Sequence, residues 1–181
     1  MPVVGMTGFE GGLQFSSASG SGRGFDGEKA SGTGTVLIQN TVVRSGSYAL
    51  SCDSTAGNSL SYLASNSYGS TVSNATYYHR LYFQLNSLPS TATAQIFQPG
   101  SGLNVRVTSA GKLQFWDNSA VQRGSDGTTT VTTNKWHLLE VKIVVGASQT
   151  CTAIEIRLNG NSEVSASGSF GSYATLSCIF G

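Results

Sequence analysis

Charged residues are scarce in this sequence. Asp, Glu, Lys and Arg together make up 10% of the 181 residues, against about 25% in an average soluble protein. Helices of soluble proteins draw most of their solvent-facing side chains from these residues, so the shortage argues against a mainly helical fold. The net charge of +1 argues against a nucleic-acid backbone or an anionic membrane as the main partner.

Cysteine and long apolar runs are scarce as well. The three cysteines, Cys52, Cys151 and Cys178, lack the spacing of a metal site. Two interpretations fit them: three buried free thiols, or one disulfide and one free thiol. No positively charged segment followed by an apolar run opens the chain, and no apolar stretch approaches the length of a membrane span. We therefore expect a protein made in the cytoplasm without a signal peptide, or a mature fragment.

Small and polar residues are abundant instead. The chain has 23 Gly, 28 Ser and 18 Thr, yet 39% of its residues are hydrophobic, so it is not a disordered chain. Short apolar runs alternate with Gly, Ser, Thr and Asn, which is typical of an all-β sandwich. No linker divides the sequence, which predicts a single domain over residues 1–181. The Gly- and Ser-rich segment Ser16–Gly34 is predicted to be a long loop.

Two hairpins can be aligned by their alternating apolar residues. In the first, Ser109-Ala110-Gly111 joins Leu103–Thr108 to Lys112–Asp117; a register with Val105 opposite Phe115 makes one face wholly apolar and sets Arg106 opposite Gln114. In the second, Trp136–Val145 pairs with Thr152–Asn159, with Val145 opposite Thr152. This register aligns Lys142 with Glu155 and Glu140 with Arg157, which predicts a solvated, charged outer face.

Four segments together resemble concanavalin A-like (laminin G-like) jelly-roll domains. They are Thr7-Gly8-Phe9-Glu10, Val43–Leu50, Tyr77–Phe83, and Trp136-His137 with Ile154–Gly160. The resemblance spans nearly the whole chain and keeps the order of the elements. It implies an all-β, two-sheet antiparallel jelly-roll sandwich. It does not specify the function, because this fold serves lectins, glycanases, lyases, adhesion domains and virus-particle proteins.

The resemblance also implies which strands share a sheet. Segments similar to Tyr77–Gln84, Ala94–Gln98, Leu103–Thr108 and Lys112–Asp117 form the concave front sheet of such domains, and the Trp136–Asn159 hairpin belongs to the convex back. The outward residues of the front strands are then candidate ligand-binding residues: Tyr78, Arg80, Tyr82, Gln95, Phe97, Asn104, Arg106, Gln114 and Trp116. Aromatic rings with Arg, Asn and Gln suit a glycan, and they also suit a protein interface. A face without a ligand is the third interpretation.

Catalysis is not expected. Glycosidases of this fold carry an E-x-D-x-E-type strand, since hydrolysis needs two carboxylates flanking one bond, and the sequence contains none. Gln95-Ile96-Phe97 is similar to the Q-I-H strand of alginate lyases, but Phe97 replaces the His. His79 and His137 both fall at inward positions, which predicts structural histidines. Among the acidic residues, only Asp117 is expected to reach the rim of the concave face.

Neither a metal nor another cofactor is expected, with one weak candidate. Glu10 matches the opening Glu with which many such domains bind Ca²⁺, but an acidic partner is missing, because the chain ends at Gly181 before the closing strand of the family. The resemblance implies that this closing strand would pair with the opening strand around Met6–Glu10. Three outcomes are open for this edge: Pro2 and the nearby glycines blunt it, the segment Gly11–Phe15 folds back over it, or a neighbouring subunit supplies the strand, which is the outcome we favour.

The features above predict a module that binds or assembles without catalysis. The main interpretation is an accessory structural protein of a bacteriophage particle, such as a capsid decoration or tail component, with other protein subunits as partners. The alternative is a lectin-like module that binds glycans through the concave sheet. A polysaccharide-degrading enzyme is the most distant alternative. Action on a virion or on an extracellular surface is expected.

Overall fold

The computed structural model describes most of the chain and is almost entirely β-structure. It covers residues 25–31, 35–47, 49–53, 60–65, 73–90, 92–100, 102–173 and 178–180. By its internal contacts the chain divides into two compact units, Met1–Tyr68 with Ser177–Gly181, and Gly69–Leu176. Within the described ranges, one short 3-10 turn at Ala147–Gln149 interrupts the strands, and no helix is long and apolar enough to cross a membrane.

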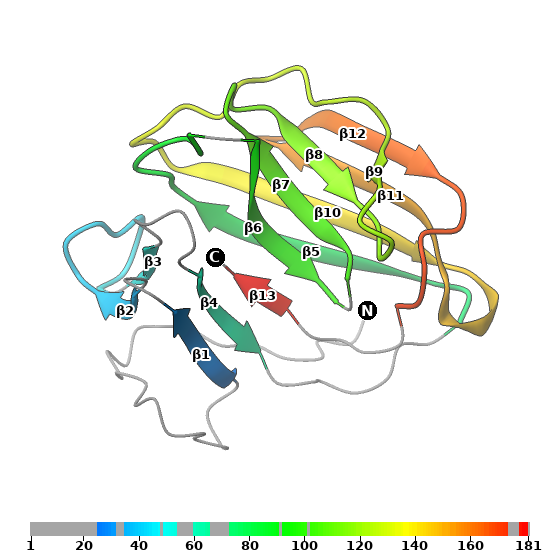
Figure 1. The fold of residues 1–181 in the computed structure, drawn as a ribbon, viewed down its shortest axis with the longest axis horizontal. Coiled ribbons are helices and arrows are strands. Elements are labelled where there is room, and N and C mark those ends of the chain that lie inside the picture. Colours follow the sequence, from blue (N-terminus) through cyan, green and yellow to red (C-terminus); the bar gives the residue numbers. More distant parts are fainter. Residues whose placement is uncertain are drawn as a thin grey trace. The chain divides into compact units, whose positions relative to one another are not determined.

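The first sheet of the unit Gly69–Leu176 has four antiparallel strands in the order β12-β11-β10-β5 (Figure 1). These are β5 (Ala75–Phe83), β10 (His137–Val145), β11 (Cys151–Leu158) and β12 (Asn161–Ser167). Along β10 buried and partly exposed residues alternate, as expected for a strand with one face in a core. The predicted register of Lys142 with Glu155 is confirmed, whereas a bulge puts Val145 opposite Cys151 instead of Thr152.

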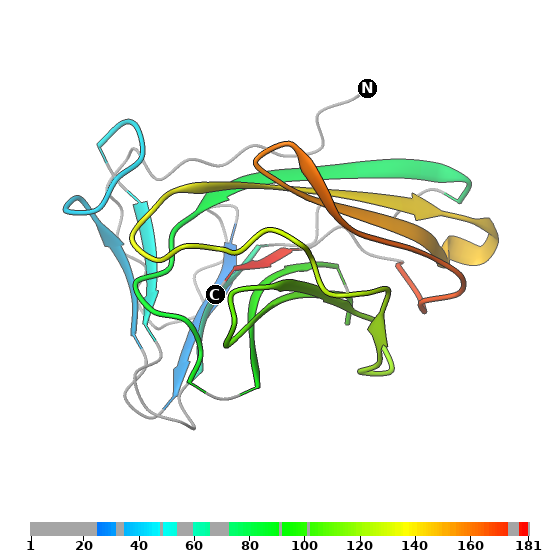
Figure 2. The same ribbon diagram turned by 90° about the horizontal axis from the view of Figure 1, so that it is seen from above.

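The second sheet of this unit also consists of antiparallel strands, in the order β6-β7-β8-β9. They are β6 (Thr93–Pro99), β7 (Asn104–Thr108), β8 (Leu113–Trp116) and β9 (Gln122–Arg123). Figure 2 shows the two sheets as separate layers, with β10 in yellow in one and β7 and β8 in green in the other. The register predicted for the β7–β8 hairpin, with Val105 opposite Phe115, is confirmed.

Gly111 ends the turn of this hairpin in a conformation that few other residues adopt. Its φ is 75°, and its amide donates to the carbonyl of Thr108 at 2.9 Å. A Cβ at this position would lie 2.8 Å from the carbonyl oxygen of Val131. The glycine is therefore required both for the left-handed turn and for the close approach of the following loop.

The core of the unit lies between its two sheets. Val105, Phe115, Val141 and Ile156 have no exposed surface. Leu81 and Phe83, which are opposite the buried Leu139 and His137, are only half-buried. Both lie on β5, which is the edge strand of its sheet as far as the chain is described, so only β10 flanks them within the sheet.

The other unit contains five strands in its described part. β1 (Phe25–Ser31), β4 (Leu60–Ser65) and β13 (Cys178–Phe180) form an antiparallel group with β4 in the middle. β2 (Thr35–Gln39) and β3 (Ala49–Asp53) pair with each other. The prediction of a loop over Ser16–Gly34 is wrong for the seven residues of β1. Their sequence has no alternating apolar pattern, and their pairing with β4 makes them a strand despite it.

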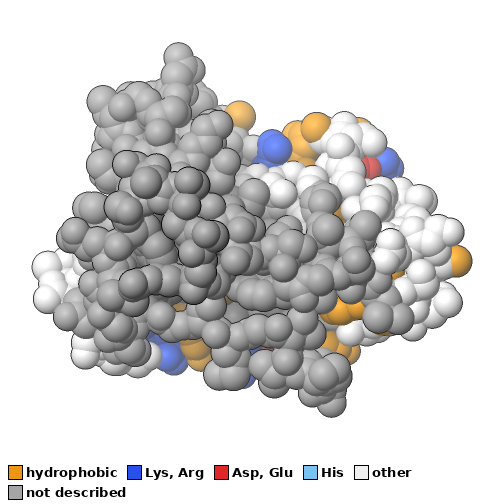
Figure 3. All heavy atoms as spheres, turned by 90° about the horizontal axis from the view of Figure 1, so that it is seen from below, with side chains coloured by type: hydrophobic (Ala, Val, Ile, Leu, Met, Phe, Trp, Pro, Cys, Tyr) orange, Lys and Arg blue, Asp and Glu red, His pale blue; other side chains and the backbone are white. Residues whose placement is uncertain are grey.

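Several predictions fall on residues outside the described ranges. The opening strand around Met6–Glu10, its partner strand, the closing strand and Glu10 as a calcium ligand remain predictions, and so does a single domain over residues 1–181. The side chain of Cys178 also lies outside the described part, so the disulfide state stays open. On the face shown in Figure 3, charged side chains of described residues are few and scattered among uncharged ones, in keeping with the composition.

Candidate functional site

The nine predicted ligand-binding residues lie on two different sheets. Tyr78, Arg80 and Tyr82 belong to β5, which pairs with β10 along its whole length, from Phe83 opposite His137 to Ala75 opposite Val145. The prediction that they share a face with the residues of β6, β7 and β8 is therefore wrong. The alternation of β5 fixes which side chains point outward, but only strand pairing decides which sheet the strand joins.

Phe97 was also expected on the outward face and lies in the core instead. It is 1% exposed, and its ring meets that of His79 edge-on with centroids 5.6 Å apart. The cause is a bulge in β6: Gln95 is opposite Arg106, but the next partner pair is Phe97 with Val105. The extra residue reverses the alternation, so that Phe97 follows Val105 inward.

The remaining five residues do share one surface. Their partner pairs across β6, β7, β8 and β9 form two transverse rows, the first with Gln95, Arg106 and Gln114, and the second with Asn104, Trp116 and Gln122. Asp126, in the loop after β9, is hydrogen-bonded to this surface. We call the seven residues the front face: Gln95, Asn104, Arg106, Gln114, Trp116, Gln122 and Asp126.

Arg106 and Trp116 form the centre of the front face. The guanidinium carbon of Arg106 lies 4.5 Å from the centroid of the Trp116 ring, which is a cation–π contact. Within the described structure, the buried Nε–H of Arg106 has no hydrogen-bond partner. Burial also lowers the pKa of Arg106 from its ordinary value, although arginine stays protonated in proteins. The front face thus holds a cation against an aromatic ring.

A relay of hydrogen bonds fixes the indole ring. Trp116 Nε1–H donates to Gln114 Oε1 at 2.9 Å, and Gln114 Nε2–H donates to Asp126 Oδ1 at 2.8 Å. Gln122 Nε2–H donates to the same carboxylate oxygen at 2.7 Å. The sequence does not predict Gln122 and Asp126 as residues of this surface. The strand β9 is only two residues long, and Asp126 follows it in a loop, so no alternation of apolar and polar residues indicates where their side chains point.

Asp117, the carboxylate expected at the rim, has a structural role. It is 2% exposed, and its oxygens accept from the amides of Ser119 and Val121 and from Arg123 Nε at 2.7 Å. Burial by itself would raise the pKa of Asp117, but the hydrogen bonds from Val121, Arg123 and Ser119 outweigh it and hold the pKa below its usual range. Asp117 therefore secures the turn that brings β9 beside β8.

Both histidines point inward, as their positions in the alternation predicted. His79 bonds to the Tyr173 hydroxyl at 2.7 Å, and burial lowers the pKa of His79 to about 4. His137 Nε2 lies 3.0 Å from the carbonyl oxygen of Thr132, and the Nδ2–H of Asn159 faces its Nδ1 at 3.2 Å. Neither ring reaches the front face, so both positions are consistent with structural roles.

The described carboxylates form no metal site. Across the described ranges, no three His, Cys, Asp or Glu residues gather so that they could hold a metal ion. Glu140 lies 3.6 Å from Arg80 of β5, and Glu155 lies 2.7 Å from Arg157 of its own strand. The predicted charged outer face is therefore present. The register suggested a pair of Glu140 with Arg157, whereas the structure pairs Glu140 with Arg80 and Arg157 with Glu155.

No family model and no curated protein matches the sequence. Among solved structures, the chain is similar to the endo-beta-1,4-glucuronan lyase of the fungus Trichoderma reesei, with a TM-score of 0.63, 15% identity, and coverage of 87% of this chain and 79% of that one. The carbohydrate-binding module CBM66 of Bacillus subtilis is a looser match, with a TM-score of 0.43, 16% identity, and coverage of 66% and 72%.

The first likeness shows the fold. Together with the two antiparallel sheets, it confirms the predicted two-sheet antiparallel jelly-roll sandwich, the fold of concanavalin A-like domains. This likeness gives no support to the predicted phage origin. At 15% identity it shows the fold alone, so the function has to be argued from the residues of the front face.

Proposed function

We propose that this chain is a glycan-binding module and that its ligand lies on the front face. The observation that carries the proposal is the contact of Arg106 with Trp116, which places a guanidinium group and an aromatic ring side by side on one sheet face. An indole ring offers an apolar face to the C–H face of a sugar, and Arg, Gln and Asn donate hydrogen bonds to hydroxyl groups. A jelly-roll sandwich provides a sheet broad enough to display these groups together.

The front face is prepared for a ligand before any ligand binds. Gln114 is 7% exposed and is held by Trp116 and Asp126 at once. Asn104 Nδ2–H donates to the carbonyl of Gly102 at 2.7 Å. Side chains that are already fixed lose little conformational entropy on binding, so more of the contact energy is available for affinity.

We further propose that the module binds without catalysis and without a metal or another cofactor. Glycoside hydrolysis needs two carboxyl groups flanking the bond, and within the described part of the front face Asp126 is the single carboxylate. Its Oδ1 is occupied by two amide donors. The proposed place of action is an extracellular surface, where glycans are displayed. Glycan binding on the front face does not require the protein subunits that the sequence predicted as partners.

A glycan array with the intact chain tests this function, followed by titration calorimetry on each ligand found. Trp116→Ala is expected to weaken binding at least about tenfold, a loss of about 1.4 kcal/mol. Trp136→Phe is the matched control, since Trp136 precedes β10 and lies outside the front face, and it should bind as the parent does. An array on which the parent binds no glycan, or equal affinity of the Trp116→Ala variant, would refute the proposal.

A further inference from the structure

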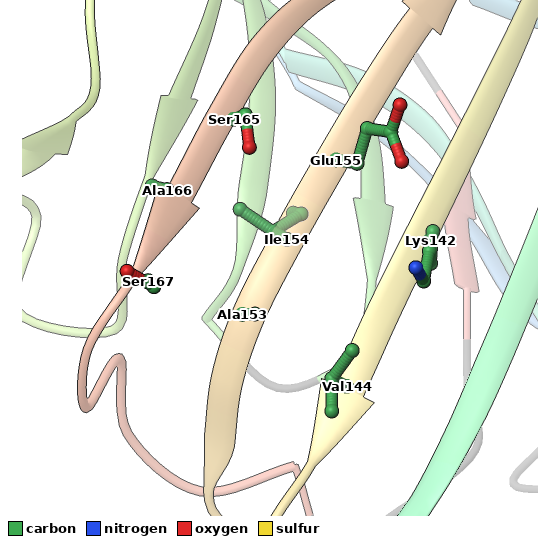
Figure 4. Close-up of a pocket in the computed structure, with 8 residues that line it drawn as sticks. All are labelled: Lys142, Val144, Ala153, Ile154, Glu155, Ser165, Ala166 and Ser167. Atoms are coloured by element: carbon green, nitrogen blue, oxygen red, sulfur yellow. The ribbon is translucent and has the colours of Figure 1, made fainter.

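Glu163 of β12 points to the side of its sheet that alternation does not predict. Its side chain is 9% exposed, and a charged side chain is seldom buried unless it is paired. Ser165 and Ser167 of the same strand are exposed and line a depression on the outward surface of the sheet (Figure 4). Strict alternation would place Glu163 on that outward surface with them.

A bulge in β12 turns Glu163 inward. Val164 is opposite Ile156 and Ser162 is opposite Arg157, so Glu163 is the extra residue between these two partner pairs. The strand therefore buries two consecutive residues, Glu163 and Val164. The bulge brings a carboxylate to a place where the pattern of the strand would have an outward side chain.

The carboxylate of Glu163 holds the loop that follows β9. Its Oε2 accepts from the amide of Thr129 at 2.8 Å and from the hydroxyl of Thr128 at 3.3 Å. Burial by itself would raise the pKa of Glu163, but the hydrogen bonds from Thr129 and Thr128 outweigh it and hold the pKa below its usual range. The Oε1 atom is buried without a hydrogen-bond partner in the described structure. The hydrogen bonds described for this carboxylate thus all go to the loop.

Gly127 packs this loop between the two sheets. A Cβ at this position would lie 3.0 Å from Oε2 of Glu163 and 3.5 Å from Cβ of Leu113 on β8. The amide of Gly127 also donates to the carbonyl of Leu113 at 2.9 Å. The loop therefore connects β12, at the edge of one sheet, with β8 of the other sheet.

Asp126 precedes Gly127 and is the loop residue that reaches the front face. Its Oδ1 accepts from Gln114 and Gln122, and Gln114 in turn accepts from the indole N–H of Trp116. A continuous series of contacts thus runs from Glu163 on one sheet, through the loop, to the aromatic ring on the other. Side chains that are held in place before binding lose less conformational entropy when a ligand arrives.

We propose that Glu163 is a positioning residue of the front face. From the opposite sheet it fixes the loop of Asp126 and, through that loop, the ring of Trp116. Its effect on glycan affinity rests on the function proposed for the front face. Its effect on the ring does not, and it can be measured on the intact chain without any ligand.

Tryptophan fluorescence tests the effect on the ring. The chain has two tryptophans, so Trp136→Phe leaves Trp116 as the single indole emitter. In this background Glu163→Ala should raise the acrylamide quenching constant at least about 1.5-fold and lower the anisotropy, because a loosened ring opens to solvent. Glu163→Gln keeps the size of the side chain and an acceptor oxygen, so it should fold even if the alanine variant does not. It should change the quenching in the same direction by a smaller factor.

Ile143→Val is the matched control for a loss of stability. Ile143 is fully buried on β10, so removal of one methylene group destabilises the fold without touching the loop. The quenching of Trp116 should stay at the parent value in this variant. An increase as large as that caused by Glu163→Ala would reduce the role of Glu163 to general stability and overturn the proposal.

Asp126→Ala tests the path through the loop. It should raise the quenching by itself, and Glu163→Ala should then add little, because both changes act on the same series of contacts. The full effect of Glu163→Ala in the Asp126→Ala background would overturn the proposal. Unchanged quenching in both Glu163 variants would overturn it as well.

The glycan array tests the consequence for binding, with Trp136 restored. Glu163→Ala should lower the signal at least about threefold on each glycan that the parent binds, and Ile143→Val should match the parent. Signals equal to those of the parent in Glu163→Ala would contradict a positioning role in binding. A parent that binds no glycan would refute the function of the front face, while the fluorescence still decides whether Glu163 fixes the ring.

Discussion

The guanidinium group of Arg106 rests on the indole ring of Trp116, 4.5 Å from its centroid, and the indole N–H is held by Gln114. These contacts join β7 to β8 on a surface that is otherwise polar. Their strength and role can be tested through the residues that hold the ring, the core beneath it and the turn beside it.

We expect Gln114→Ala to lower the free energy of unfolding by about 1–3 kcal/mol, because it leaves the indole N–H of Trp116 without its acceptor. Glycan affinity should fall as well, since the ring is no longer fixed. Urea denaturation and calorimetry measure the two effects. Gln122→Ala is the control, because Gln122 bonds to the same Asp126 but leaves the bond from the indole N–H to Gln114 in place. The free energy of unfolding of this variant should stay within about 0.5 kcal/mol of that of the parent.

Phe115→Ala should cost about 3–5 kcal/mol of unfolding free energy. Phe115 is fully buried and its ring packs edge-on against that of Phe170, with centroids 5.4 Å apart. Phe83→Ala should cost clearly less, because Phe83 is only half-buried on β5. Denaturation curves of the two variants give the comparison. Equal losses of unfolding free energy would contradict the partial burial of Phe83.

Stability should fall as the pH drops from about 6.5 towards 4, because of His79. The pKa of His79 is about 4 in the folded chain, whereas an unfolded histidine has a pKa of about 6.5. The unfolded state therefore binds the proton first, and acidification favours unfolding by up to a few kcal/mol. The measurement is the unfolding free energy at pH 7.5 and at pH 5.

His79→Gln is the control for this pH dependence. It should remove most of the difference between the two pH values. Asp117 and Glu163 also have lowered pKa values, but folding loses their contribution only below about pH 4.5, where unfolded carboxylates take up protons. An unchanged pH profile in the His79→Gln variant would contradict the assignment.

Asp117→Asn should loosen the turn between β8 and β9 and cost about 1–3 kcal/mol. The substitution removes the charge that pairs with Arg123, while an amide oxygen can still accept from Ser119 and Val121. Asp126→Asn is the matched control at an exposed position and should change stability little. The unfolding temperatures of the Asp117→Asn and Asp126→Asn variants at pH 7 give the comparison. An Asp117→Asn protein more stable than the parent would contradict the structural role of this carboxylate.

Local sequence patterns were sufficient for the two hairpins and therefore for half of the front face. The alternation around Val105 and Phe115 allowed only one register, and this register set Arg106 opposite Gln114 and Asn104 opposite Trp116. A slip by one residue would have turned every apolar side chain to solvent. The same reasoning found the pairing of Lys142 with Glu155 on the other sheet.

The sequence by itself determined the all-β class, the turn at Gly111 and the inward direction of both histidines, because these depend on the alternation of residues near one another in the chain. Tertiary structure alone decided that β5 joins β10, that a bulge turns Phe97 into the core, and that Asp126 meets Gln114. Each of these depends on contacts between distant segments. The alternation of a strand specifies its two faces but not its neighbour, and one extra residue in a ladder exchanges those faces.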